Sequence, residues 1–206
     1  MEPREKLEIF KERYYFEHDR HEKLTSRLGI PITVLTFIFG ILTFYLNSIL
    51  PFELSLWFMV FSILSALVII FVIMTVFHLI RSYYNYEYSY FPLPFDLKRD
   101  LDNIIEYYGN SYFNNLTQSD KERRIDKDID ELLLNYYIEA ANNNTKNNDT
   151  KSKHLHLAFS NLIIAIIFLI LSSVPFLVIK SFSKENTKKE KVINLNIGGY
   201  NVKQRK

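Results

Sequence analysis

Three long apolar runs divide the chain, and none of them contains Asp, Glu, Lys or Arg. They extend over Leu28–Leu50, Leu54–Ile80 and Leu155–Ile179. An α-helix rises about 1.5 Å per residue, so roughly 20 apolar residues cross the hydrocarbon layer of a bilayer. Each run is long enough, which predicts three transmembrane helices. A soluble bundle of helices that are apolar on every side is the alternative, and the length of all three runs disfavours it.

The polar segment before the first run has the spacing of an amphipathic helix. A mostly apolar stripe recurs every three or four positions, at Leu7, Phe10, Tyr14, Glu17, His21, Leu24 and Leu28. We expect this helix to continue directly into the first span. Pro31 is expected to kink it or to mark the point where the chain enters the membrane.

The segment between the second and third runs predicts two further helices. Pro92 and Pro94 exclude a continuation of the preceding helix there, and Asp96 is expected to cap a new helix that Gly109 ends. Ser119 and Glu122 match a capping box. No helix breaker follows until Ser173, so a long helix is expected to extend into the third span, loosened around Asn142–Asn148.

The basic residues predict the orientation. The turn between the first two spans, Asn47–Glu53, has no Lys or Arg, whereas seven precede the first span and ten lie in Arg81–Lys153. Basic residues concentrate on the cytoplasmic side, which predicts a cytoplasmic N-terminus and middle segment. A third crossing then places the tail, with eight Lys and Arg from Lys180 onward, outside. The alternative is a third segment that dips into the membrane and returns near Pro175.

Together these patterns predict an all-α membrane protein with three transmembrane helices and cytoplasmic helical extensions. The expected parts are a cytoplasmic amphipathic helix (1–28), a two-span hairpin (29–80), a cytoplasmic helical region (81–154), a third transmembrane helix (155–180) and a basic tail (181–206).

Aromatic residues are dense just after the second span, in Arg81–Phe95. Tyrosine and tryptophan favour the headgroup level of a bilayer, so we expect a membrane-interface collar. Its members are Tyr83, Tyr84, Tyr86 and, at the other end of the span, Trp57. Two alternatives stay open, namely packing of the later aromatics against the cytoplasmic helices and stacking on a nucleotide base. The later aromatics are Tyr88, Tyr90, Phe91 and Phe95.

Asparagines are concentrated in 142–148, immediately before the third span. Helical spacing aligns the predicted interhelical contact residues Tyr137, Ala141, Asn144 and Asn148 on one face. Hydrogen bonds to another helix, within one chain or between subunits, would justify such weak helix formers. Asn142 and Asn147 are expected on other faces. The alternative is a flexible Asn-rich loop.

The sequence contains no recognisable catalytic arrangement. Cysteine is absent, which excludes disulfides. His18 and His21 are spaced for a metal ion but lack a third ligand cluster, and His78 lies near the end of a span. Basic clusters are interleaved with acidic residues, so direct nucleic-acid binding is not expected. The spans lack the charged groups that active transporters use. We therefore expect no enzyme, no metal and no cofactor.

Three features occur together in this chain: the charged helix before Pro31, the tight two-span hairpin and a residue pattern in the helix that follows the hairpin. The residues concerned are Tyr15, Glu17, Arg20, Lys23, Leu24 and Arg27 in the first helix, and Tyr137, Ala140, Asn144 and Asn148 in the later one. In this order the features resemble the SLATT family of small bacterial membrane effectors. The third span and the basic tail depart from a plain two-span pattern.

The resemblance implies a function at the bacterial inner membrane. Proteins of this type are linked to nucleotide signalling and antiphage defence, and related membrane accessories accompany some retrons and CRISPR loci. We therefore expect a homo-oligomer that permeabilises the lipid bilayer after a signal from a nuclease or signal-producing partner encoded nearby. The alternative is a membrane-anchored adaptor that binds a soluble partner through its cytoplasmic helices and conducts nothing.

Overall fold

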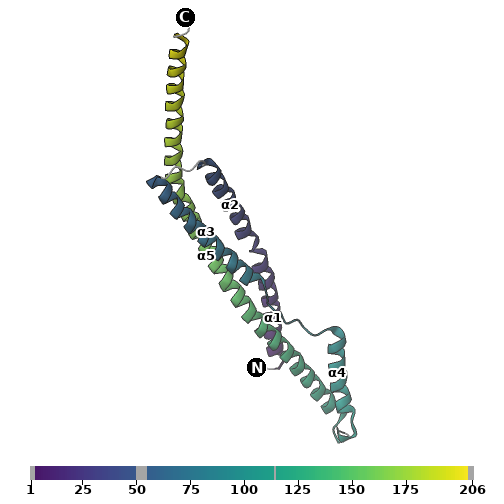
Figure 1. The fold of residues 1–206 in the computed structure, drawn as a ribbon. Coiled ribbons are helices and arrows are strands. Elements are labelled where there is room, and N and C mark those ends of the chain that lie inside the picture. Colours follow the sequence, from purple (N-terminus) through teal and green to yellow (C-terminus); the bar gives the residue numbers. More distant parts are fainter. Residues whose placement is uncertain (1–2, 50–54, 114, 204–206) are drawn as a thin grey trace. The chain divides into compact units, whose positions relative to one another are not determined.

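The computed structural model describes residues 3–49, 55–113 and 115–203, with side chains for 4–49, 55–113 and 115–182. Within these ranges every regular element is helical and no strand occurs, so the expected all-α fold is confirmed. The elements are α1 (Pro3–Ser26), α2 (Gly29–Ile49), α3 (Leu56–Tyr83), α4 (Pro94–Gly109), the 3-10 turn η1 (Ser111–Phe113) and α5 (Gln118–Lys203) (Figure 1).

Three helical stretches are long and apolar enough to cross a membrane, judged by length and composition. They lie within Arg4–Ile49, Leu56–Tyr83 and Gln118–Phe182. The three expected apolar helices are therefore present in the described residues. Of the expected turn Asn47–Glu53, residues 47–49 belong to α2, and residues 50–53 lie outside the described residues.

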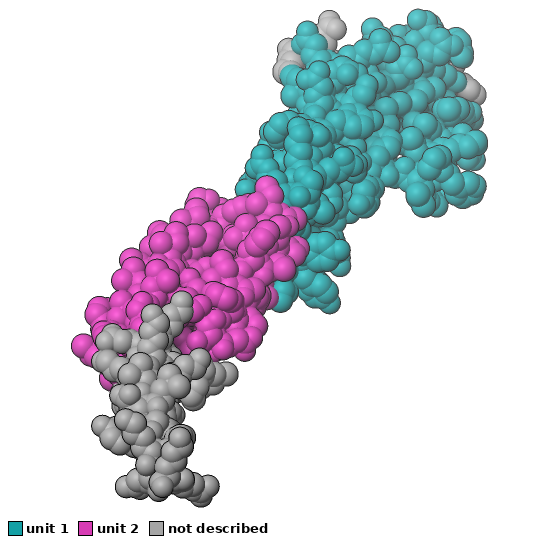
Figure 2. Space-filling model, turned by 90° about the horizontal axis from the view of Figure 1, so that it is seen from above, with its two compact units in different colours: residues 1–28, 80–155 teal, residues 29–79, 156–206 magenta. Residues whose placement is uncertain are grey.

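The chain forms two compact units, coloured separately in Figure 2. Unit 1 comprises Met1–Leu28 and Ile80–Leu155, and unit 2 comprises Gly29–Leu79 and His156–Lys206. Helix α5 contributes to both units, because its first part belongs to unit 1 and its apolar part to unit 2.

The first helix does not continue without interruption into the first span. A turn at Arg27 and Leu28 separates α1 from α2. Pro31 explains its position, since proline has no N–H to donate to the carbonyl four residues earlier and its ring clashes with that carbonyl. The clash falls on Arg27. Pro31 itself lies in the first turn of α2, where a missing N–H costs little.

Gly109 ends α4 as expected, but the two expected N-terminal caps lie elsewhere. Leu93 is the N-cap of α4, without a side-chain cap, and Asp96 lies inside the first turn. Helix α5 is capped by Thr117, two residues before Ser119. The Thr117 Oγ1 accepts the Asp120 N–H at 3.2 Å and donates to the Asp120 carboxylate at 2.7 Å.

Helix α5 is continuous from Gln118 to Lys203, which confirms the expected long helix. The segment Asn142–Asn148 is helical throughout, so the expected loosening and the flexible-loop alternative are wrong. The helix also continues through Pro175 and does not turn back there, as the dipping alternative required. Side chains of the tail beyond Phe182 lie outside the described residues.

Unit 2 has an apolar interior built from α2, α3 and α5. Val68, Ala158 and Ala165 are fully buried, and small side chains at the α5 positions permit close helix approach. The Tyr45 ring stacks on Phe176 with centroids 4.3 Å apart, and its hydroxyl lies 2.7 Å from the Ser173 Oγ. Aromatic and small-residue packing therefore joins α2 to α5.

Candidate functional site

Unit 1 is organised around the residues that follow α3, which have no regular secondary structure. Both backbone groups of Ser89 bond to one side-chain amide, with the Ser89 N–H donating to the Asn144 Oδ1 and the Asn144 Nδ2 donating to the Ser89 carbonyl, each at 2.9 Å. The N–H and C=O of one residue point to the same side only in an extended backbone. We call Tyr86–Phe91 the extended segment.

Neighbouring asparagines of α5 bind the same segment. The Asn143 Nδ2 donates to the Glu87 carbonyl at 2.8 Å and to the Ser89 Oγ at 2.9 Å. The Asn147 Nδ2 donates to the Glu87 carbonyl at 2.6 Å. With Asn144 and Asn148 they form what we call the asparagine ladder (Asn143, Asn144, Asn147 and Asn148). Asn147 was expected on an uninvolved face, but its bond to Glu87 makes it part of the ladder.

Asn148 connects three elements of unit 1. Its Nδ2 donates to the Glu17 carbonyl of α1 at 2.8 Å and to the Glu17 Oε2 at 2.9 Å. Its Oδ1 accepts the Tyr88 hydroxyl at 2.8 Å. Asn148 and Glu17 are both fully buried. Because a buried polar group without a partner costs free energy, these bonds fix α1 and the extended segment against α5.

The buried carboxylate of Glu17 is neutralised by two arginines of its own helix. The Arg13 guanidinium lies 2.7 Å from the Glu17 Oε1, and the Arg20 guanidinium lies 3.3 Å from the Oε2. Arg20 also reaches α5, where it pairs with Asp149 at 2.7 Å. A buried charge is tolerated only when it is paired and hydrogen-bonded. Glu17 is paired through both oxygens but hydrogen-bonded through Oε2 alone, from Arg20 and Asn148.

Lys151 is the second buried charge, one turn beyond Asn148. It is 2% exposed, and its Nζ donates to the Thr25 Oγ1 at 2.7 Å. Its backbone carbonyl accepts the Ser82 hydroxyl at the end of α3, at 3.1 Å. Burial lowers the pKa of Lys151. The amine therefore ties α1 to α5, and the Ser82 bond ties α3 to the same turn.

Tyrosine and histidine side chains close the face of the extended segment toward α1. The Tyr88 ring lies 3.9 Å from the His21 ring, and Tyr90 lies 6.3 Å from His18. Burial, followed by the neighbouring Tyr86 and Tyr90, raises the pKa of Tyr88 to about 12. Burial, followed by the charge of Lys151, lowers the pKa of His21.

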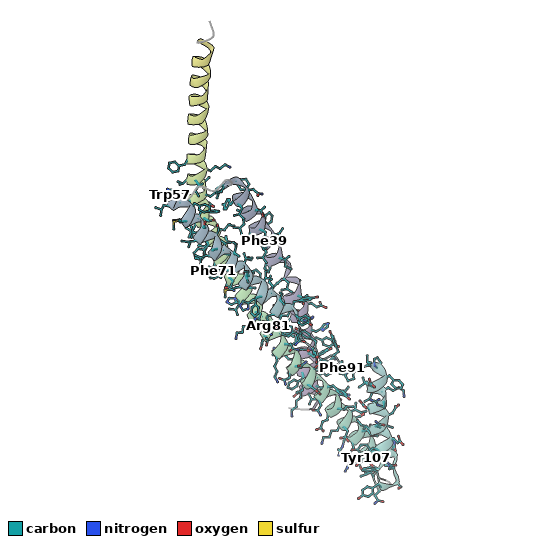
Figure 3. All side chains as sticks on the ribbon, in the orientation of Figure 1. Phe39, Trp57, Phe71, Arg81, Phe91 and Tyr107 are labelled. Carbon is teal, nitrogen blue, oxygen red and sulfur yellow. The ribbon has the colours of Figure 1, made fainter. Side chains whose placement is uncertain are left out.

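The later aromatics pack against helices of unit 1, which was the first alternative to the collar. Phe91, labelled in Figure 3, lies between α3 and α4 in the sequence. Its ring stacks on Tyr137 with centroids 4.7 Å apart, and its N–H donates to the Tyr14 hydroxyl at 3.3 Å. Tyr14 also lies 5.7 Å from Tyr137 and packs with Ala141. Phe95, by contrast, is 77% exposed at the start of α4.

The proposed collar residues are exposed to different degrees. Tyr83 and Tyr84 are 69% and 73% exposed at the end of α3, whereas Tyr86 is partly buried and donates to the Arg81 carbonyl at 2.8 Å. Trp57, at the start of α3 in unit 2, is 42% exposed. Contact of these side chains with lipid headgroups stays a prediction.

Helix α2 carries a feature that the sequence reasoning missed. Its buried face consists of large side chains, but an exposed face consists of small and polar ones. We call the second face the α2 small-residue stripe, formed by Thr33, Thr36, Gly40, Thr43 and Asn47. The alternating four- and three-residue steps were visible in the sequence. Each threonine hydroxyl donates to the carbonyl four residues earlier, so the stripe is smooth and internally satisfied.

Next to this stripe, a partly open cavity of about 270 Å³ lies between α2 and α3. Thr43 and Ser65 are the polar residues that line it, among apolar neighbours. The Ser65 hydroxyl is buried and has no hydrogen-bond partner among the residues the structure describes. The surface of α2 in unit 2 therefore offers both a smooth contact face and unfilled space.

No group of three or more His, Asp or Glu suited to a metal ion occurs in the described parts of the chain. His18 lies 3.8 Å from Glu22, and His21 packs on Tyr88, so the two histidines have separate surroundings.

The polar residues of unit 1 thus act as structural connectors between helices.

Comparison of the chain with models of known protein families, with curated proteins and with solved structures gave no match.

Proposed function

We propose that this chain is a multi-pass protein of the bacterial inner membrane that oligomerises and permeabilises the bilayer as a defence effector. The sequence resemblance to SLATT-type effectors supports this proposal. Unit 1 lies in the cytoplasm and receives the signal, and unit 2 lies in the lipid. The trigger is a product of, or contact with, a partner encoded nearby.

The α2 small-residue stripe is the observation that carries the proposal. Helices in lipid gain little from burying apolar surface, because the lipid tails are equally apolar. They associate where small residues let backbones approach closely. A stripe of threonine, glycine and asparagine on an outward face therefore suits contact with a second copy or the polar lining of a pore between copies.

A leakage assay with matched variants tests this proposal. Thr36→Leu with Gly40→Leu fills the stripe, and a Cβ at Gly40 meets no atom within 4 Å, so the fold accepts it. Ser62→Leu with Ala66→Leu makes the same change on an exposed face of α3. At a protein density high enough to drive assembly without the trigger, dye-loaded vesicles of bacterial phospholipid should leak with the parent and the α3 control and should stay sealed with the stripe variant. Equal leakage from both variants, or none from the parent, would refute the proposal.

The orientation follows from the basic residues and has a separate test. The N-terminus and unit 1 lie in the cytoplasm, and the tail lies outside, because seventeen Lys and Arg before the third span outweigh eight from Lys180 onward. Alkaline phosphatase fused after Lys206 should be active. A fluorescent cytoplasmic reporter at that position, together with an inactive phosphatase fusion, would show that the tail lies in the cytoplasm.

Exposed aromatic side chains favour a second candidate, the membrane-anchored adaptor. Phe95 is 77% exposed on α4, and Tyr112 in η1 is 89% exposed. Aromatic residues are enriched at protein interfaces, so these could bind a soluble partner. The adaptor requires no leakage under any condition. Partner binding that is lost in Phe95→Ala with Tyr112→Ala, with vesicles sealed throughout, would favour it over the effector.

A further inference from the structure

We propose that the outer edge of the extended segment pairs with the same segment of a second copy, as two antiparallel strands centred on Tyr88. The inference concerns unit 1 alone. It rests on the oligomerisation in the proposed function but not on permeabilisation.

The inner edge of the segment is saturated by side chains. The Glu87 carbonyl, both backbone groups of Ser89 and the Phe91 N–H bond to the asparagine ladder or to Tyr14. In an extended chain the backbone groups of successive residues point to opposite sides. Residues 87, 89 and 91 therefore face inward, and the backbone groups of Tyr86, Tyr88 and Tyr90 face outward.

The outer edge has no partner within the part of the chain that the structure describes. The backbone N–H and C=O groups of Tyr86, Tyr88 and Tyr90 make no hydrogen bond there. An unpaired strand edge is a template for another strand. Proteins bind extended peptides at such edges through main-chain hydrogen bonds.

The asparagine ladder prepares this edge for pairing. Fixing the backbone of a residue costs roughly 1–2 kcal/mol of conformational entropy. Here the bonds from Asn143, Asn144 and Asn147 already hold the segment extended in the single chain. A partner strand therefore meets a preorganised edge, which reduces the entropy that binding must lose.

The side-chain order identifies the same segment of a second copy as the partner. Centred on Tyr88, an antiparallel pair places Tyr88 opposite Tyr88, Tyr86 opposite Tyr90 and Glu87 opposite Ser89. Aromatic pairs across strands are stabilising, and like charges opposite each other are destabilising. This register has aromatic pairs and separates the two Glu87 carboxylates. A two-fold interface requires such self-complementarity.

The register also agrees with the free backbone groups. Tyr88 forms a hydrogen-bonded pair with Tyr88 of the second copy, and Tyr86 forms one with Tyr90. These pairs use only the outward backbone N–H and C=O groups. Glu87 and Ser89 form the non-hydrogen-bonded pair, whose Cα atoms lie about 4.5 Å apart. That distance suits a disulfide.

The absence of cysteine from the sequence permits a direct cross-linking test. Glu87→Cys and Ser89→Cys chains are produced separately, then mixed, reconstituted together in bacterial phospholipid and oxidised with copper phenanthroline. The mixture should shift from monomer to disulfide-linked dimer containing one chain of each kind. Each variant alone should stay mainly monomeric, because 87–87 and 89–89 pairs are diagonal. Dimers of equal yield in all three samples, or none in the mixture, would overturn the proposal.

A proline substitution tests the backbone bonds themselves. Tyr90→Pro removes one outward N–H from each chain and leaves the inward N–H groups of Ser89 and Phe91 intact. Tyr90→Ala removes the same ring but keeps the N–H. At about 1 kcal/mol per hydrogen bond, Tyr90→Pro should weaken dimerisation roughly tenfold or more relative to Tyr90→Ala. Equal dimerisation of the two variants would exclude pairing at this edge.

The outcomes separate this contact from the proposed function. A cross-link at 87–89 with sealed vesicles supports the contact and refutes permeabilisation. Leaking vesicles with no cross-link in the mixture refute the contact and leave the effector function standing.

Discussion

The two units of this chain differ in the charge that they bury. Among the residues that the structure describes, the fully buried side chains of unit 2 are uncharged and include Val68, Ala158, Ala165 and the hydroxyl-bearing Thr75 and Ser172. In unit 1 the polar side chains of Glu17 and Asn148 are fully buried, and those of Asn144 and Lys151 are 2% exposed. The same helix α5 supplies residues of both kinds.

The difference reflects the two environments that the proposed function assigns to the units. In lipid, close packing of small and aromatic side chains holds helices together, and polar groups are expensive. In unit 1, the backbone groups of the extended segment that face the helices are shielded from water and need partners, and the asparagine ladder supplies them. Polar bonds should therefore control unit 1, and packing should control unit 2.

The largest effect is expected at Glu17. Glu17→Ala leaves Arg13 and Arg20 without their common carboxylate and the Asn148 amide without one acceptor. Loss of the charge-assisted hydrogen bonds to this carboxylate costs about 1.5–3 kcal/mol, and the cavity left by the side chain adds to that cost. Thermal unfolding of unit 1, followed in detergent, should move to clearly lower temperature. Glu12→Ala, at an exposed position of the same helix, is the control, and an equal shift for both variants would contradict the polar interior.

Asn148→Leu should have the next largest effect. It leaves the Tyr88 hydroxyl without its acceptor and removes the bonds to Glu17, at about 1–3 kcal/mol for an unsatisfied buried group. Limited proteolysis should then cut the extended segment faster. Asn142→Leu is the matched control on an exposed position of α5. Unchanged cleavage in Asn148→Leu would mean that the ladder does not hold the segment.

Ala165→Leu tests the packing of unit 2. Ala165 is fully buried, and overpacking a well-filled interior costs roughly 1–3 kcal/mol. Resistance of unit 2 to unfolding in sodium dodecyl sulfate should fall, while cleavage of the extended segment stays at the parent rate. Ile163→Leu, exposed on the same helix, should change neither. Faster cleavage of the extended segment in Ala165→Leu would show that the units are not independently stabilised.

Lys151→Met should have the smallest effect on folding stability, and it should raise the stability of unit 1 where the other changes lower stability. Burial lowers the Lys151 pKa below its usual 10.5, so the unfolded chain binds this proton more tightly than the folded one. Folding stability in the parent should therefore rise as the pH increases toward 10.5. Replacing the buried ammonium with an apolar side chain should stabilise unit 1 by about 1 kcal/mol at neutral pH and reduce that alkaline rise.

The control for this variant is Lys146→Met, at an exposed position of α5. Unfolding midpoints measured from neutral to alkaline pH compare the two. A Lys151→Met chain that is less stable than the parent would mean that the bond to Thr25 contributes more than the burial of the charge costs.

Much of the helical architecture could be predicted from the sequence, because a long run of apolar residues indicates a helix in an apolar environment. The apolar lengths predicted all three long helices, and the absence of breakers predicted a long α5. The boundaries were less predictable. Ser119 and Glu122 match a capping box, and only the structure shows that Thr117 is the cap.

The spacing of Asn144 and Asn148 predicted a shared face, and both are buried. Their partners could not be predicted, because every residue carries the same backbone groups and the sequence does not mark those of Glu87 and Ser89 as binding partners. Asn147 illustrates the limit, because its position on the helix suggested an uninvolved face. Because the extended segment lies close to α5, the short Asn147 side chain still reaches the Glu87 carbonyl.

Residue-resolved hydrogen–deuterium exchange of the extended segment, in monomeric detergent-solubilised protein, tests the ladder most directly. The Ser89 and Phe91 amides donate to Asn144 and Tyr14 and should exchange slowly. The Tyr88 and Tyr90 amides face outward and should exchange fast, and Asn144→Leu should release Ser89 alone. Uniform exchange across these four amides, or a slow Ser89 amide in Asn144→Leu, would contradict a segment held along one edge by asparagine side chains.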